Sequence, residues 1–167
     1  MVERALKPCD LEQLVRLQVR VKAGMEQDDW LFPCPEEEME FILSGGGYGI
    51  GLFEEEKLMG AWLLYYPIGR GDGLGGEIGQ DPEKVAQYEL ALLDESLRGR
   101  GLHAKMAEKL TAHCAADGRF THILMTAHPD NLASLRAFTN RGYTVAATKK
   151  MYGGVLRSIA YKALQDD

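Results

Sequence analysis

Seven residues say most about this chain: Arg98-Gly99-Arg100-Gly101-Leu102-His103-Ala104. An apolar run at 88–93 precedes them, and apolar residues recur at helical spacing from Leu102 to Cys114. This pattern predicts a strand, a short glycine turn and the first turn of a helix. Such a turn leaves backbone N–H groups unpaired at the positive end of the helix dipole, and glycine lets an anion approach the main chain closely. The stretch therefore predicts a phosphate-binding site.

Two common phosphate-binding motifs are absent from the sequence. It contains neither G-x-x-x-x-G-K-[ST] of P-loop proteins nor G-x-G-x-x-G of dinucleotide-binding folds. The glycine turn also comes late, whereas a dinucleotide-binding fold usually opens with it. A second pattern lies downstream, at the spacing N-x-x-[AS]-x-x-x-[YF]-x-x-x-G-[FY]. Its residues are Asn131, Ser134, Phe138, Gly142 and Tyr143.

Together the two patterns resemble those of the GNAT superfamily of N-acetyltransferases. The coenzyme loop of that superfamily reads [QR]-x-x-G-x-[GA], which Arg98 and Gly101 match, while His103 takes the last position. The second pattern is similar to that of the helix that follows the coenzyme loop and the next strand. The resemblance covers 88–143 by motif and the rest of the chain by the order of its elements.

The predicted elements follow the order β-α-α-β-β-β-α-β-α-β-β. Strands joined through a helix should be parallel, and strands joined by tight turns should be antiparallel. This order predicts an α/β fold with one mixed, mostly antiparallel sheet and helices on both faces. The resemblance implies that two neighbouring parallel strands splay apart. At 167 residues the chain is expected to be a single domain, 1–167.

Several local features are predicted as well. Asp10 should cap the first helix, with Gln13 as its capping-box partner. Either Asn131 or Asp130 should cap the later helix that begins at about residue 131. The pair Gly153-Gly154 predicts a two-residue hairpin turn. A glycine-rich loop at 69–82 is expected to be a lid or a mobile segment.

Composition and charge exclude several classes of protein. The net charge of −6 without a basic block argues against nucleic-acid binding. The longest nearly apolar run, 58–68, is too short to span a membrane, and the N-terminus lacks the apolar region of a signal peptide. Cys9, Cys34 and Cys114 are scattered and predict reduced thiols in a cytoplasmic protein. No spacing of histidines with cysteines or carboxylates suggests a metal site.

The resemblance implies acetyl-CoA as the cofactor. The backbone of Ala91 and Leu93 would bond its pantetheine arm, the amides of 99–104 would hold its pyrophosphate, and Asn131 would contact the pantetheine. The full set assigned to coenzyme binding is Ala91, Leu93, Arg98, Gly99, Arg100, Gly101, Leu102, His103, Ala104, Asn131, Ser134 and Phe138.

The chemistry implied is attack of an amine on the thioester, which needs a base. Alternation along the strand places Gln87, Glu89, Ala91 and Leu93 on one face. Of the two positions where family members carry the base, 87 and 89, only Glu89 can titrate. Glu89 is therefore the candidate base, directly or through water. Asp94 is a weaker candidate because it should point to the other face.

The departing thiolate needs a proton donor, and here the sequence differs from the family pattern. Many family members carry a tyrosine at the Phe138 position, and phenylalanine cannot donate a proton. Tyr152 is therefore the candidate acid, Tyr143 is expected to be structural, and departure without a dedicated acid is the alternative. The expected catalytic residues are Glu89 and Tyr152.

The resulting prediction is an N-acetyltransferase that acts on a primary amine of a small molecule or peptide by direct attack. The acidic residues at 28–29 and 36–40 would attract a cationic amine, although a solvated, acidic helix face that favours the helix dipole is the preferred interpretation of them. Phe138 supports the alternative of a non-catalytic acyl-CoA-binding or sensing module, and a different phosphate ligand in the same loop is a third reading. Many family members pair, so the resemblance allows a homodimer.

Overall fold

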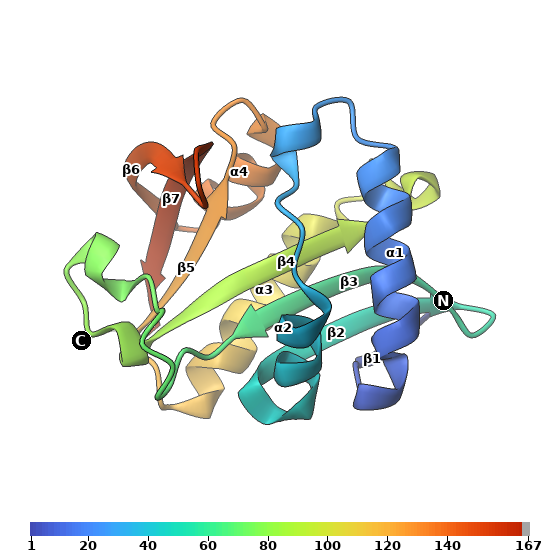
Figure 1. Cartoon of the computed structure of the whole chain (residues 1–167), viewed down its shortest axis with the longest axis horizontal. Coiled ribbons are helices and arrows are strands. Elements are labelled where there is room, and N and C mark those ends of the chain that lie inside the picture. Colours follow the sequence, from blue (N-terminus) through green and yellow to red (C-terminus); the bar gives the residue numbers. More distant parts are fainter. Residues whose placement is uncertain (165–167) are drawn as a thin grey trace. The chain divides into compact units, whose positions relative to one another are not determined.

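The structure is a computed structural model that describes residues 1–164, and it contains the predicted elements in the predicted order (Figure 1). The strands are β1 (Val2–Ala5), β2 (Gly47–Glu54), β3 (Lys57–Tyr65), β4 (Val85–Leu93), β5 (His122–Ala127), β6 (Thr144–Met151) and β7 (Val155–Ala163). The helices are α1 (Leu11–Ala23), α2 (Glu36–Phe41), α3 (Leu102–Asp117) and α4 (Leu132–Thr139).

The strands form one mixed sheet in the order β1-β2-β3-β4-β5-β7-β6, which confirms the predicted fold class. The pairs β1–β2, β2–β3, β5–β7 and β6–β7 are antiparallel, and β4–β5 is parallel. The parallel ladder joins only Val85–Gln87 to His122–Leu124. The remaining six residues of β4 are not paired with β5, as the expected splay of this strand pair requires.

Residues 1–65 and 89–102 form one compact unit. Its core contains Leu14 and Leu17 of α1, Met39 of α2, and Leu90 and Leu92 of β4. In Figure 1, α1 and α2 lie on the viewer's side of β2 and β3. The buried leucines of α1 therefore pack on the sheet, and β4 contributes apolar side chains to the same core.

The predicted capping box of α1 is wrong. The Asp10 carboxylate makes no cap bond to α1, because it accepts two hydrogen bonds from the Arg4 guanidinium (both 2.8 Å) and one from the Lys7 N–H (2.8 Å). Gln13 instead bonds the start of β3, where its Oε1 accepts from the N–H of Leu58 (2.8 Å), and the β2–β3 connection, where its Nε2 donates to the carbonyl of Glu56 (3.2 Å). A guanidinium with two donors outcompetes a single backbone N–H for the carboxylate.

This ion pair gives a first prediction. Arg4 and Lys7 hold the pKa of Asp10 below its ordinary value, so the pair stabilises the fold above about pH 4 and loses that contribution as pH falls through the lowered pKa. Replacing the buried Asp10 by asparagine should cost about 2 kcal/mol of unfolding free energy at pH 7. Urea unfolding of wild type and variant at pH 7 and at pH 3 measures the difference in unfolding free energy at each pH. A deficit of equal size at both pH values would refute this role.

Residues 66–88 and 103–164 belong to the second unit. Its sheet buries Val85, Leu124 and Ile159, and Leu74 and Ile78 of the glycine-rich loop pack against them. The loop is therefore part of the packed structure.

Two polar contacts also fasten this loop, contrary to the expectation of a lid. The N–H of Leu74 donates to Oε1 of the buried Gln87 (2.8 Å), and Lys149 of β6 donates to Glu77 (2.6 Å). Gln87 thus holds a loop, whereas the sequence placed it at a possible base position.

The β6–β7 turn differs from the predicted two-glycine hairpin. It contains three residues, Tyr152, Gly153 and Gly154, with φ values of +50°, +81° and +128°, and the N–H of Gly154 donates to the carbonyl of Met151 (3.0 Å). Tyr152 therefore adopts a left-handed conformation that is uncommon for a residue with a side chain.

Candidate active site

The glycine loop starts from a firmly held turn, Glu95–Leu97, with Asp94 as its N-cap. The Asp94 carboxylate accepts from the N–H and hydroxyl of Ser96 (3.1 and 2.8 Å) and from Nε of Arg20 (2.9 Å). These donors hold the pKa of Asp94 below its usual range. Asp94, the weaker base candidate, is thus engaged in anchoring the loop.

Two glycines give the loop its shape. Gly99 and Gly101 have φ values of +77° and +70°, a conformation that glycine adopts without strain. The N–H of Arg98 is used by the carbonyl of Glu95 (3.2 Å), and residues 98–99 form a turn that involves the N–H of Arg100, but no described residue accepts a main-chain hydrogen bond from the N–H groups of Gly99, Gly101 or Leu102. Left-handed residues next to such groups form concave anion sites, and the α3 dipole adds positive potential. The loop thus presents main-chain donors to an anion.

The rest of the assigned loop continues into α3. Arg98 and Arg100 are exposed, and Nη2 of Arg100 lies 3.4 Å from the carbonyl oxygen of Ser96. His103 and Ala104 occupy the first turn of α3 and are half-buried.

The candidate base Glu89 lies in β4 and is half-buried, and Ala91 is exposed. The charge of Glu89 contributes to raising the pKa of Cys34, and Cys34 belongs to the same core as Leu90 of this strand.

Gln18 holds Cys34 in place from α1. The side-chain amide of Gln18 donates to the Cys34 carbonyl (2.9 Å) and accepts from the Cys34 N–H (2.9 Å). Burial, followed by the charges of Glu89 and Glu38, raises the pKa of the thiol to about 12. Cys34 is therefore protonated at neutral pH and is a poor nucleophile. No sequence pattern signalled this placement, because it depends on packing between α1, α2 and β4.

The thiols give a second prediction. Cys9 is exposed, whereas Cys34 and Cys114 are buried with pKa values near 12. Iodoacetamide at pH 8 should therefore modify Cys9 alone in the folded protein and all three cysteines after unfolding. Mass spectrometry of the intact protein counts the additions. Modification of Cys34 as fast as Cys9 would show that the described burial is wrong.

In the second unit, Asn131 caps α4. Its Oδ1 accepts from the N–H of Ser134 (3.3 Å), which decides between Asn131 and Asp130 in favour of Asn131. Because the carbonyl oxygen is occupied by the cap, the Asn131 amide offers its NH2 group as a donor.

Phe138 lies in a buried aromatic cluster of the second unit. Its ring makes edge-to-face contacts with Tyr88 (centroids 4.8 Å apart) and with Tyr143 (5.1 Å). Such contacts stabilise by about 1 kcal/mol each beyond area burial. Phe138 thus contributes to packing, and its ring has no group that could donate a proton.

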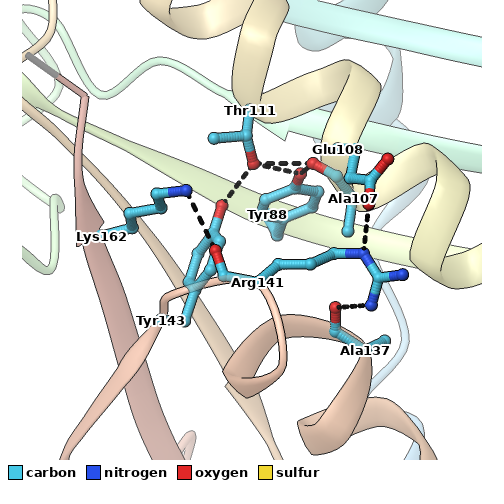
Figure 2. A network of polar contacts seen from close by, with 8 residues as sticks. All are labelled: Tyr88, Ala107, Glu108, Thr111, Ala137, Arg141, Tyr143 and Lys162. Atoms are coloured by element: carbon cyan, nitrogen blue, oxygen red, sulfur yellow. Dashed lines mark hydrogen bonds and ion pairs between the residues drawn. The ribbon is translucent and has the colours of Figure 1, made fainter.

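The two tyrosine hydroxyls of this cluster bind α3 (Figure 2). Tyr88 donates to the carbonyl of Ala107 (2.8 Å), and the hydroxyls of Tyr143 and Thr111 lie 2.6 Å apart. Burial raises the pKa of both phenols. Tyr143 therefore has the structural role that the sequence predicted.

Arg141 continues this network at the end of α4. Figure 2 shows Nε of Arg141 bonded to Glu108 of α3 (2.8 Å), while its carbonyl accepts from Lys162 of β7 (3.0 Å). α3, the α4–β6 connection and β7 are thereby tied together within the second unit.

The candidate acid Tyr152 lies on the β6–β7 turn and is 42% exposed. Its hydroxyl is 3.3 Å from the hydroxyl of Thr126, near the end of β5. This places a polar pair at the same end of β5 as the turn before α4.

Residues 1–164 contain neither a membrane-spanning helix nor a cluster of metal-ligating side chains. None of the helices there combines the length and apolar character needed to cross a bilayer. In that range, no three or more His, Cys, Asp or Glu side chains are grouped so that they could hold a metal ion.

Comparison with known proteins identifies the family. The model of the acetyltransferase (GNAT) family matches residues 11–143. L-2,4-diaminobutyric acid acetyltransferase of Streptomyces anulatus is 39% identical over 59 residues. That match covers 35% of this chain and 33% of the relative, so the chain matches only a third of the relative's length.

Solved structures share the fold at low sequence identity. An acetyltransferase of the GNAT family from Streptococcus pneumoniae superposes with a TM-score of 0.74 at 16% identity, covering 97% of this chain and 98% of that one. An aminoglycoside acetyltransferase in complex with coenzyme A and kanamycin gives 0.71 at 18% identity, covering 97% and 94%. The family match spans most of the chain and contains the glycine loop and the capped α4, so this chain belongs to the GNAT acetyltransferase family.

Proposed function

We propose that this chain transfers the acetyl group of acetyl-CoA to a primary amine of a small molecule or peptide. The observation that carries the proposal is the glycine loop, in which the N–H groups of Gly99, Gly101 and Leu102 have no main-chain acceptor among the described residues. Family membership supports acetyl-CoA as the ligand of this loop, because an acetyltransferase must bind an acyl donor. The match at 11–143 runs through both compact units, so we propose that they act as one domain, 1–167.

The proposed coenzyme contacts are those that the family resemblance implies for these positions. The amides of 99–104 bind the pyrophosphate, with Arg98 and Arg100 adding positive charge. The backbone groups of Ala91, an exposed residue, and of Leu93 bond the pantetheine arm. The NH2 group of Asn131, oriented by Ser134, donates to a pantetheine carbonyl, and Phe138 contributes apolar surface.

The proposed reaction is direct attack on the thioester. The amine nitrogen bonds to the carbonyl carbon, the C–S bond breaks, and the proton lost by the amine goes to Glu89 directly or through water. The departing thiolate takes a proton from Tyr152 or from solvent. A route through a cysteine acyl-enzyme is disfavoured at Cys34, because its thiol is protonated at neutral pH.

The acceptor is proposed to be a cationic amine. Glu38 of α2 and the candidate base Glu89 of β4 both act on the Cys34 thiol, so a second carboxylate adds negative charge to the same unit as the base. The named relatives include enzymes of diaminobutyrate and of an aminoglycoside, which are both amines. Negative potential near the base favours such cations.

A second candidate function is supported by one observation. Phe138 stands where many family members have a tyrosine, and its buried ring cannot donate a proton. A chain with this cluster could bind acyl-CoA as a sensor without turnover.

Release of the coenzyme A thiol tests both candidates. Purified protein with acetyl-CoA and a panel of diamines, aminoglycosides, amino acids and peptides should release thiol faster than the enzyme-free control with at least one amine. Thermal stabilisation by acetyl-CoA without thiol release across the panel would favour the sensor. Absence of both stabilisation and release would reject both functions.

A further inference from the structure

A turn at the end of β5 sets the position of Asn131. The carbonyl of His128 accepts from the N–H of Asn131 (2.9 Å), and the carbonyl of Asp130 accepts from the N–H of Leu132 (2.9 Å). Pro129 restricts the backbone of His128 to extended conformations. These constraints leave the side chain of His128 to fix the remaining backbone group of the turn, the N–H of Asp130.

The imidazole of His128 makes that contact. Nδ1 accepts from the N–H of Asp130 at 3.1 Å, and the side chain is about nine-tenths buried. A ring nitrogen that accepts a hydrogen bond carries a lone pair, so the other ring nitrogen of the neutral imidazole bears the hydrogen. The Asp130 carboxylate lies 4.0 Å from Nδ1 and is mostly exposed. The bond to Nδ1 therefore comes from the main chain.

The geometry is that of an Asx-turn made with histidine. In an Asx-turn, the side-chain oxygen of Asn or Asp accepts from the N–H two residues later. Nδ1 of histidine is separated from Cα by the same number of bonds as Oδ1 of asparagine, and here it accepts from the N–H two residues later. The imidazole thus closes the turn that leads into the α4 cap.

We propose that His128 is a positioning residue for the coenzyme, acting through the turn that places Asn131 at the start of α4. This inference rests on the proposed function, in which the NH2 group of Asn131 donates to the pantetheine arm. His128 itself touches no substrate in this account. Its acceptor nitrogen reduces the freedom of the turn, so that the Asn131 donor is preorganised before the coenzyme arrives.

The test measures coenzyme A binding by isothermal titration calorimetry, which needs no knowledge of the acceptor. His128→Leu removes the acceptor and should raise Kd about tenfold. His128→Asn keeps an acceptor at the same distance from Cα and should bind within about twofold of wild type. His122→Leu, at the opposite end of β5, is the control for loss of a histidine and should leave Kd unchanged.

A double variant tests whether His128 acts through Asn131. Asn131→Asp keeps an oxygen for the Ser134 cap and removes the donor, so it should weaken binding by itself. If His128 acts only by positioning Asn131, adding His128→Leu to Asn131→Asp should cause no further loss. Fully additive losses would overturn the proposed route.

The remaining outcomes are also decisive. Equal weakening by His128→Leu and His128→Asn, or wild-type affinity in His128→Leu, would overturn the role of His128 while leaving the proposed function intact. Failure of the wild-type protein to bind coenzyme A would reject the proposed function itself. If His128→Leu does not fold by circular dichroism, His128→Ala removes the acceptor without adding an apolar side chain and takes its place.

Discussion

Replacing Gly101 by valine should weaken coenzyme A binding about a hundredfold or more, as measured by titration calorimetry. Gly101 has a φ of +70°, which is strongly unfavourable for a β-branched residue. A Cβ at this position would meet no atom within 4 Å, so the effect comes from backbone strain. The loop would relax away from this conformation and lose main-chain donors to the pyrophosphate, each contributing about 1.5–3 kcal/mol as a charge-assisted bond.

Gly118 provides a matched control for this substitution. It follows the other end of α3, has a φ of +80°, and also leaves open space around a Cβ. Gly118→Val should therefore impose similar backbone strain and a similar loss of stability, with coenzyme A affinity unchanged. Equal loss of affinity in both variants would mean that the Gly101 effect is only general destabilisation.

Replacing Glu89 by glutamine should lower kcat about 10²- to 10⁴-fold, the contribution typical of a general base. The substitution preserves size and removes the proton acceptor. Coenzyme A affinity should stay within about twofold of wild type, since Glu89 is assigned to the amine and not to the coenzyme. Steady-state kinetics with the best amine of the panel, together with calorimetry, separates the two effects.

Glu38→Gln is the control for charge near the base. The carboxylates of Glu89 in β4 and Glu38 in α2 both raise the pKa of Cys34. Either substitution should therefore lower that pKa from about 12. Only Glu89→Gln should lose most of kcat. If the two variants lose kcat equally, Glu89 contributes as one of two charges and is not the base.

The segments predicted correctly from the sequence are those whose structure is set by nearby residues. Gly99 and Gly101 adopt the left-handed conformations that a glycine turn before a helix requires, and Asn131 caps α4 through the N–H three residues later. Both features depend on contacts within a few residues. The order of elements was predictable for the same reason, because periodicity and turn residues mark each one.

The features that the sequence did not reveal depend on distant partners. Asp10 looked like a helix cap, but Arg4 of the neighbouring strand takes its carboxylate. The glycine-rich loop looked mobile, but Gln87 of β4 binds the N–H of Leu74. The sequence shows that a carboxylate or a backbone N–H is present. It does not show which distant hydrogen-bond partner the fold brings next to that group.

The side chains near Glu89 illustrate the same limit. Period-two alternation describes β4 alone, whereas the charge of Glu89 acts on Cys34, a residue of the core that α1 and α2 share with β4. Such packing between elements leaves no mark in composition, so the surroundings of candidate catalytic residues need the structure.

The claim on which the proposed function depends is that the main-chain N–H groups of 99–102 bind the pyrophosphate of coenzyme A. Amide nitrogen–proton correlation spectra recorded during titration test it directly, with coenzyme A in one series and acetyl-pantetheine, which lacks the pyrophosphate, in the other. The amide signals of Gly99 and Gly101 should shift strongly with coenzyme A and remain in place with acetyl-pantetheine. Saturation with coenzyme A that leaves both glycine signals unmoved would contradict the account.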